Sequence, residues 1–271
     1  MRWYMLGCVI GDIVGSIYEF NNIKTKDFEF FQKSMQFTDD SVLALATADW
    51  LLNGGDVAEY YVKYGNKYWH PMGGYGSRFI LWLSDSLHGI KPPYNSCGNG
   101  SAMRVGPVGW AFKTKEETLV AAKKSAECTH NHPEGIKGAQ ATALAIFMAR
   151  NGSSKDEIKK TISEEFDYDL SLTVEELRPR YSWKGMDGKG NGGICQGTVP
   201  QALICALDAT SFEDAIRNAI SVGGDSDTLG CITGGIAEAI YGIPEDIYKK
   251  GFAYLDKDLQ AVVTAFEGKY K

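Results

Sequence analysis

Apolar residues recur at helical spacing along almost all of this 271-residue chain. Such spacing is typical of amphipathic α-helices, and the strict alternation that marks a half-buried strand is missing. Residues that favour a helix start stand near the beginning of several periodic segments: Asp39, Asp56, Ser154, Ser211 and Asp227. We therefore predict an all-α fold of many helices around one apolar core. The expected helices cover roughly 3–19, 39–53, 56–69, 76–88, 115–129, 134–150, 154–165, 195–208, 211–221, 227–241 and 255–268.

No Pro-, Gly- or Ser-rich linker divides the chain, so we predict one compact multi-helix domain over residues 1–271. Small residues in several expected helices, among them Gly7, Gly11 and Gly15, indicate close helix packing. Residues 89–102 and 184–193 are rich in Gly and Asn and are expected to form loops. Backbone N–H groups of such loops can close around phosphates, although neither segment matches a phosphate-binding fingerprint.

Composition excludes several classes of protein. A net charge of −6 argues against a broad nucleic-acid or membrane surface. The six cysteines form no CxxC pair and do not resemble a disulfide framework, so a reducing cytoplasm is expected. The apolar N-terminal run is interrupted by Asp12 and carries one Arg, unlike a signal peptide. No apolar run is long enough to span a bilayer, and we expect a soluble protein.

Two short clusters of oxygen-bearing side chains each precede an apolar helical run. The first is Thr38-Asp39-Asp40 and the second is Asp225-Ser226-Asp227-Thr228. Helix capping explains either cluster alone, because Asp, Ser and Thr are preferred at helix N-termini. Capping, however, uses one or two side chains, and adjacent carboxylates repel one another unless a cation lies among them. Together the clusters favour a site for Mg²⁺ or Mn²⁺, which prefer oxygen ligands, with room for two ions.

Several segments carry a resemblance to a known family. In chain order, four match: GDIVGSIYEF, FTDDS, CGNGSAMRVGPVG and GGDSDTLGCITGGIAEAIYG. Two further segments, THNHPEGIKGAQATA and GTVPQALICAL, are similar to its histidine-containing segment and to a helix before the last metal motif. The chain thus resembles the ADP-ribosylglycohydrolase family, which includes dinitrogenase-reductase-activating glycohydrolase and the eukaryotic ADP-ribosyl-acceptor hydrolases. The resemblance covers nearly the whole chain and implies an all-α fold.

The family resemblance implies magnesium-dependent hydrolysis of the glycosidic bond between ADP-ribose and an acceptor, which is a modified protein side chain or a small molecule. It assigns two Mg²⁺ ions, with Mn²⁺ as a substitute, to Thr38, Asp39, Asp40, Asp225, Asp227 and Thr228. It implies that Glu19 transfers protons, with Asp39 and Asp40 as the other candidates. It assigns substrate binding to Ser96, Cys97, Gly98, Asn99, Gly100 and His130.

Other functions compete with this interpretation. Cys97 is a candidate nucleophile with His130 or His132 as its base, and Cys128, His130 and His132 are candidate zinc ligands. A catalytically inactive ADP-ribose binder, or an immunity protein against an ADP-ribosylating toxin, would have the same fold. The acceptor linkage stays open among arginine, serine, nucleobase, O-acetyl and poly-ADP-ribose, and Glu19 favours the O-linked forms. Candidates to stack on adenine are Tyr75, Tyr94 and Trp183.

Overall fold

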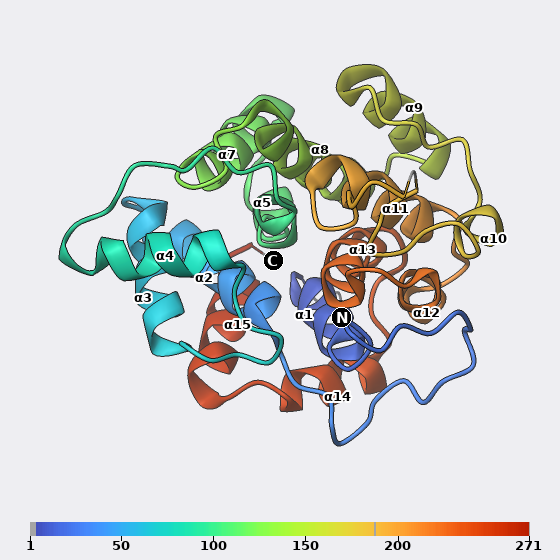
Figure 1. The fold of residues 1–271 in the computed structure, drawn as a ribbon, viewed down its shortest axis with the longest axis horizontal. Helices are drawn as coiled ribbons and strands as arrows, with labels where there is room; N and C mark the ends of the chain where they lie inside the picture. The colour runs from blue at the N-terminus through green and yellow to red at the C-terminus, as the bar shows by residue number, and fades with distance from the viewer. Residues whose placement is uncertain (1–3, 187, 271) are drawn as a thin grey trace.

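The computed structural model describes residues 4–186 and 188–270. In these ranges the fold is all-α, as predicted, and β-structure is limited to two isolated bridges, Thr38 with Met72 and Gly98 with Ile194. The elements, shown in Figure 1, are α1 (Leu6–Gly15), α2 (Asp39–Asn53), α3 (Val57–Lys67), α4 (Ser77–Asp85), the 3-10 helix η1 (Ser86–His88), α5 (Gly100–Met103), α6 (Val108–Ala111), α7 (Lys115–Glu127), α8 (Pro133–Arg150), α9 (Lys155–Phe166), α10 (Val174–Leu177), α11 (Cys195–Leu207), α12 (Phe212–Val222), α13 (Ser226–Tyr241), α14 (Glu245–Ala253) and α15 (Lys257–Tyr270).

Each expected helix coincides with an observed one, with corrections at the ends. The helix expected over 3–19 ends at Gly15, and its first residue lies outside the described residues. The helix expected over 76–88 is divided into α4 and η1. Four helices were not predicted: α5, α6, α10 and α14. The first three have four residues each, too few for a periodic pattern, and α14 begins directly after Pro244.

Helices α1 and α13 pack at the centre of the fold with their backbones in contact, and the other helices surround them (Figure 1). A Cβ atom on Gly11 would lie 1.8 Å from the carbonyl oxygen of Gly230, and one on Gly234 would lie 2.1 Å from that of Gly7. Only glycine permits this approach, which agrees with the close packing expected from the sequence. The contact brings the C-terminal end of α1 beside the N-terminal end of α13, because Gly15 lies against Ser226 and Asp227.

Side chains cap about half of the helices, and the two acidic clusters differ in this respect. Asp56, Ser154 and Ser211 are N-caps, as their positions in the sequence predicted. Helix α2 is capped by Thr38, whose hydroxyl accepts the Asp40 N–H, and it begins at Asp39, as predicted. Asp225 occupies the N-cap position of α13 without a side-chain capping bond. Neither helix is therefore capped by a carboxylate of these clusters.

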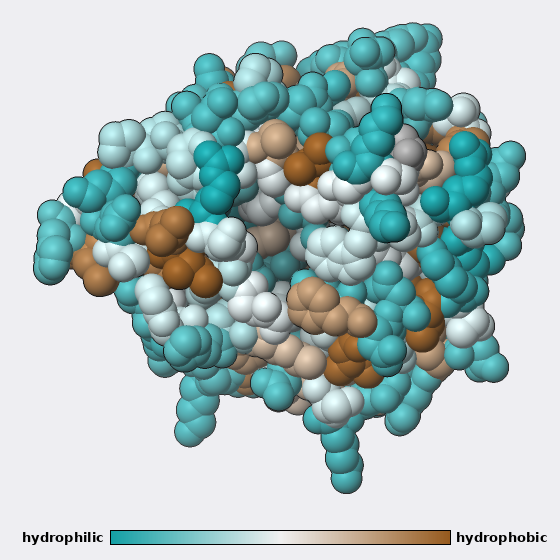
Figure 2. Space-filling view, in the orientation of Figure 1, coloured by the Kyte–Doolittle hydropathy of each residue, from teal (hydrophilic) through white to brown (hydrophobic). Residues whose placement is uncertain are grey.

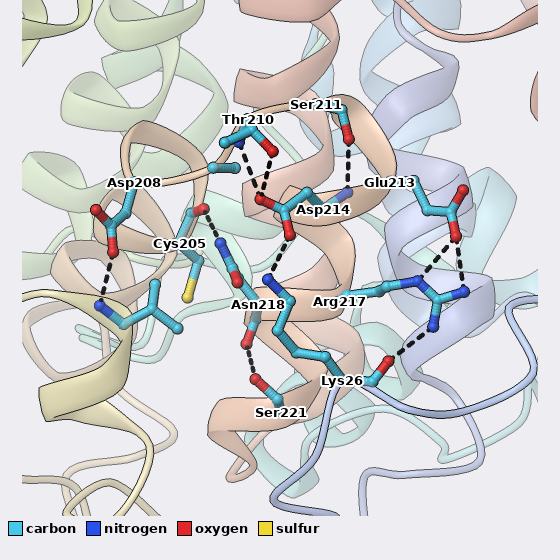
Figure 3. Close-up of polar contacts among 12 residues, drawn as sticks. Lys26, Cys205, Asp208, Thr210, Ser211, Glu213, Asp214, Arg217, Asn218 and Ser221 are labelled. Atoms are coloured by element: carbon cyan, nitrogen blue, oxygen red, sulfur yellow. Dashed lines mark hydrogen bonds and ion pairs between the residues drawn. The ribbon is translucent and has the colours of Figure 1, made fainter.

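A long connection, residues 16–38, joins α1 to α2 and is anchored on α12 (Figure 3). Arg217 of α12 donates to the carbonyl oxygens of Lys26 and Phe28, both at 2.8 Å, and Asp214 forms an ion pair with Lys26. Charge-assisted bonds of this kind are stronger than neutral ones. They hold a segment without regular secondary structure, which contains Glu19 and ends at the start of α2.

All six cysteines are free thiols. Among the described residues, no helix combines the length and the apolar character that crossing a bilayer requires.

Candidate functional site

The structure brings the two acidic clusters together at the meeting point of α1, α2 and α13. Carboxylate oxygens of Asp12, Asp40 and Asp227 lie within 4.8 Å of one another, and so do those of Glu19, Asp225 and Asp227. The hydroxyl of Thr228 lies 3.3 Å from Oδ2 of Asp40, which joins the second cluster directly to the first. Five acidic side chains from distant parts of the sequence therefore share one buried centre.

Burial and mutual repulsion make this centre electrostatically unfavourable on its own. Desolvation, followed by the neighbouring charges of Asp225 and Asp40, raises the pKa of Asp227 well above its usual range. Desolvation, followed by Asp225 and Asp12, raises the pKa of Glu19 to about 7. Within the described residues none of these carboxylates belongs to an ion pair. A cation among them would remove the repulsion.

The donor chemistry fits a hard divalent cation. Oδ1 of Asp40 and Oε2 of Glu19 are buried and have no hydrogen-bond partner in the part of the chain that the structure describes. Unpartnered buried carboxylate oxygens are costly, and coordination to a metal ion would satisfy them. Carboxylate and hydroxyl oxygens are the ligands that Mg²⁺ and Mn²⁺ prefer.

Asp12 is a member of this centre that the sequence analysis did not identify. Its carboxylate accepts from the backbone N–H and the hydroxyl of Thr38, at 2.9 and 2.6 Å, and from the N–H of Ser41 at 3.1 Å. The Ser41 hydroxyl also donates to it. Burial raises the pKa of Asp12 to about 6, and these bonds oppose the rise. Asp12 thus fixes the first turn of α2, and an acid inside the apolar run of α1 was its only signal in the sequence.

A cleft of about 450 Å³ opens above the acidic centre, and Figure 2 shows the molecule hollowed near the middle of this face. Most predicted site residues line it: Glu19, Asp39, Asp40, Ser96, Gly98, Asn99, Gly100, His130, Asp225, Asp227 and Thr228. Two predicted residues, Thr38 and Cys97, are not among its described lining residues. Thr38 lies behind the wall, bonded to Asp12, and the Cys97 carbonyl accepts the N–H of Cys195 at 2.9 Å.

Asn99 couples the loop at one wall of the cleft to the acidic centre. Its side-chain amide donates to Oδ2 of Asp225 at 2.7 Å and to the hydroxyl of Thr198 at 3.1 Å. Asn99 also begins α5, since its carbonyl accepts from Ala102 and Met103. This short helix corrects the expectation that residues 89–102 form a loop throughout.

Aromatic side chains surround the mouth of the cleft. Tyr75, Tyr94 and Trp183, the three candidates for stacking, all line it. Trp183 stacks on Phe20 with ring centroids 6.1 Å apart and planes 3° apart, and its indole N–H donates to the carbonyl of Glu19 at 2.8 Å. Phe20 was not predicted, because one exposed aromatic residue in a connection carries no periodic signal.

The competing zinc site finds no support in the geometry. Within the described residues, the groups able to hold a metal contain only Asp and Glu. His132 is instead the N-cap of α8, and its Nδ1 accepts the N–H of Glu134 at 3.1 Å. The Cys128 thiol donates to the carbonyl of Ser125 at 3.5 Å.

Comparison with known proteins agrees with the all-α fold. The family described as ADP-ribosylglycohydrolase matches residues 2–269. The chain is 27% identical to human ADP-ribosylhydrolase ARH3, covering 96% of this chain and 91% of that protein, and 28% identical to the zebrafish (Danio rerio) protein, covering 89% and 82%. It is 27% identical to ADP-ribosylarginine hydrolase Tri1 of Pseudomonas putida, covering 88% and 70%.

A solved structure shares the arrangement of helices. It is titled "ADP-ribosylglycohydrolase-related protein complex" and superposes with a TM-score of 0.71 at 21% identity, covering 98% of this chain and 96% of that one. At 21% identity, the similarity to this structure shows the fold alone. The family match over residues 2–269 is instead a match of the amino-acid sequence. The chain belongs to the ADP-ribosylglycohydrolase family.

Proposed function

We propose that this protein hydrolyses the glycosidic bond between ADP-ribose and an acceptor in a magnesium-dependent reaction, and so reverses ADP-ribosylation. The observation that carries the proposal is the convergence of five carboxylates, four of them buried and Glu19 partly buried, at the base of a cleft, with no ion pair to any of them among the described residues. Relatives over nearly the full length are named ADP-ribosylhydrolases.

The ion site in this proposal is formed by side chains of α13 and of the start of α2. Two Mg²⁺ ions, or Mn²⁺, would be held by Thr38, Asp39, Asp40, Asp225, Asp227 and Thr228. Bound metal would polarise the ribose hydroxyls and a water molecule. Asn99 holds Asp225 in place through its 2.7 Å bond, and Asp12 holds the first turn of α2. The fixed negative charge would stabilise the oxocarbenium character that develops at the anomeric carbon.

Proton transfer is assigned to Glu19. Its side chain reaches the acidic centre from the connection after α1, and burial, the largest cause, raises the pKa of its carboxyl group towards the range in which a group can donate and accept a proton near neutral pH. Trp183 holds the Glu19 backbone at the mouth of the cleft, where an acceptor would leave. Asp39 and Asp40 are the alternative proton-transfer groups.

The cleft wall formed by Ser96, Gly98, Asn99, Gly100 and His130 would bind ADP-ribose, with Cys97 behind it. The acceptor is an ADP-ribosylated protein side chain or a related ADP-ribosyl compound. Relatives of similar identity differ in their names, since Tri1 is an ADP-ribosylarginine hydrolase and ARH3 is named without an acceptor. We further infer one domain over residues 1–271, from the shared core of α1 to α15, and a reducing cytoplasmic location, from the six free thiols.

A panel of ADP-ribosylated arginine, serine and nucleic-acid substrates, assayed with Mg²⁺ and with EDTA, tests this function. We expect release of ADP-ribose from at least one substrate, lost in EDTA and restored by excess Mg²⁺ or Mn²⁺. Tight ADP-ribose binding without release from any of them would instead identify an inactive binder or an immunity protein.

A further inference from the structure

His130 lies in the cleft wall, and its ring nitrogens face different surroundings. The residue is 5% exposed, and its backbone N–H donates to the carbonyl of Ala126 at 2.8 Å. Nε2 faces the loop of Gly98 and Gly100, because a Cβ atom on either glycine would lie 3.5 or 3.2 Å from it. Nδ1 points away from this loop and lies 2.7 Å from the hydroxyl oxygen of Thr129.

The direction of the hydrogen bond between Thr129 and His130 follows from a third residue. Nη2 of Arg104 donates to the Thr129 hydroxyl at 2.8 Å and to the carbonyl of Ser125 at 2.8 Å. A guanidinium group only donates, so the Thr129 oxygen is the acceptor in that bond. Its own proton is then free to point towards Nδ1.

Two arrangements satisfy a 2.7 Å contact: Thr129 donates to Nδ1, or a protonated Nδ1 donates to Thr129. In the second, the Thr129 oxygen would accept two bonds, and its proton would turn to the nearby sulfur of Cys128, a weak acceptor. With a proton on Nδ1, only the Thr129 hydroxyl group would separate this N–H group from the Arg104 cation. The first arrangement pairs the strongest available donors and acceptors.

The Arg104 charge is fixed in this place. Its side chain is fully buried, and the guanidinium carbon lies 4.0 Å from the centroid of the Tyr61 ring. Desolvation and the charges of Arg104 and Arg78 lower the pKa of His130 well below its usual value, so the ring is neutral. A neutral imidazole with Nδ1 as acceptor carries its proton on Nε2.

We propose that Arg104 and Thr129 are positioning residues that fix His130 as the Nε2-protonated tautomer, so that it presents an N–H donor to an oxygen atom of the bound ADP-ribose. The consequence for the bound molecule rests on the proposed function; the tautomer itself does not. The arrangement also makes His130 unsuitable as the base for a Cys97 nucleophile, because Nε2 has no lone pair to receive a proton.

Long-range ¹H–¹⁵N spectra of the full chain with ¹⁵N-labelled histidine measure the tautomer directly, and His130→Gln assigns the signal among the four histidines. We expect Nε2 to be protonated in the wild type. Thr129→Val removes the hydroxyl and should give a mixture of tautomers, and Thr129→Ser should retain the wild-type pattern. Thr142→Val is the matched control, because Thr142 is also buried but its hydroxyl has no partner.

Calorimetric titration with ADP-ribose in Mg²⁺ provides the second readout. Affinity should fall about two- to tenfold in Thr129→Val, the range of one neutral hydrogen bond, and stay near wild type in Thr129→Ser and Thr142→Val. A proton on Nδ1 in the wild type would overturn the proposal even if Thr129→Val fails to fold, and so would an unchanged tautomer in folded Thr129→Val. Nε2 protonation in a wild type that binds no ADP-ribose would support the role of Arg104 and Thr129 while removing the proposed function.

Discussion

The floor and the rim of the cleft are built on opposite principles. The floor, defined as Asp40, Asp225, Asp227 and Thr228 together with Asp12 behind them, lies on helices or at their ends and is almost completely buried. The rim, defined as Phe20, Arg78, Tyr94 and Trp183, lies mostly on connections, and Phe20 is 76% exposed. The floor is fixed by backbone contacts between α1 and α13, whereas the rim is joined by a few side-chain contacts.

This difference indicates a division of labour. A centre that must hold several charges at fixed separations needs a rigid support, because small displacements weaken electrostatic stabilisation. A surface that receives varied acceptors gains from exposed aromatic groups on segments that tolerate sequence change.

The largest effect is expected from a single floor carboxylate. Asp227→Asn keeps the shape but removes a charge that metal binding would require, so turnover should fall by about 10³-fold or more. Because the mutation also relieves repulsion, the melting temperature without metal should rise, and its increase with Mg²⁺ should disappear. Assays and thermal melts with and without Mg²⁺ check this. Asp246→Asn, an exposed change on α14, is the control, and a loss of less than tenfold in Asp227→Asn would contradict the assignment.

A large effect on stability is expected where α1 meets α13. In Gly11→Ala, the new methyl group would lie 1.8 Å from the carbonyl oxygen of Gly230, and the two backbones must separate. We expect the free energy of unfolding, measured in urea, to fall by about 3 kcal/mol or more. Gly268→Ala in α15 is the matched control, since a Cβ there meets nothing within 4 Å and should stabilise the helix by under about 1 kcal/mol. Equal free energies of unfolding for the two variants would contradict the proposal that the contact between α1 and α13 makes the floor rigid.

Glu238 is a buried carboxylate that lies outside the floor, so its behaviour can be compared with that of the floor carboxylates. Oε2 of Glu238 accepts the N–H of Gly7 at 2.9 Å, at the end of α1 that lacks a side-chain cap. Burial raises the pKa of Glu238 to about 8, from an ordinary value of 4.5. The folded state therefore binds more protons than the unfolded state between these values. Stability from this group is complete below about pH 4.5 and is lost as pH rises to about 8.

Glu238→Gln resembles the protonated form and should reduce that loss. Urea unfolding at pH 5 and pH 8 should show a smaller decrease in the free energy of unfolding than in the wild type, by on the order of 1–3 kcal/mol. Glu59→Gln, the same substitution at an exposed position, is the control. Mg²⁺ should not alter the difference between Glu238→Gln and the wild type, because Glu238 belongs to no cluster of metal ligands among the described residues. If the free energy of unfolding changed equally with pH in variant and wild type, Glu238 would be ionised in the folded protein from pH 5 to pH 8.

The sequence predicted the long helices well, because each carries two or more turns of apolar periodicity. It also indicated both acidic clusters, since several oxygen-bearing side chains precede a helix in each. Short helices such as α5 were missed because four residues hold no period. Asp12 was missed because a partner set made of Thr38 and Ser41 exists only after α1 and α2 pack.

The pairing of Arg104 with Thr129 is a second contact that sequence reasoning could not reach. An arginine that follows a Gly-rich segment is usually interpreted as an exposed or phosphate-binding group. Arg104 is instead fully buried and packs over the ring of Tyr61. Its contacts link residues 21 and 25 positions apart in the chain. Only tertiary packing sets such a link, whereas local patterns determine helix periodicity and caps.

The smallest effect is expected at the rim, from Trp183. Trp183→Ala removes the stacking partner of Phe20 and the N–H bond to Glu19, whereas Trp183→Phe removes only the bond. If the rim serves binding alone, KM for the ADP-ribosylated substrate should rise about two- to tenfold in Trp183→Ala and less in Trp183→Phe, with kcat nearly constant. Steady-state kinetics with both variants separate the two contributions. A fall in kcat shared by both would show instead that the indole N–H positions Glu19, and the boundary between floor and rim would then have to include this bond.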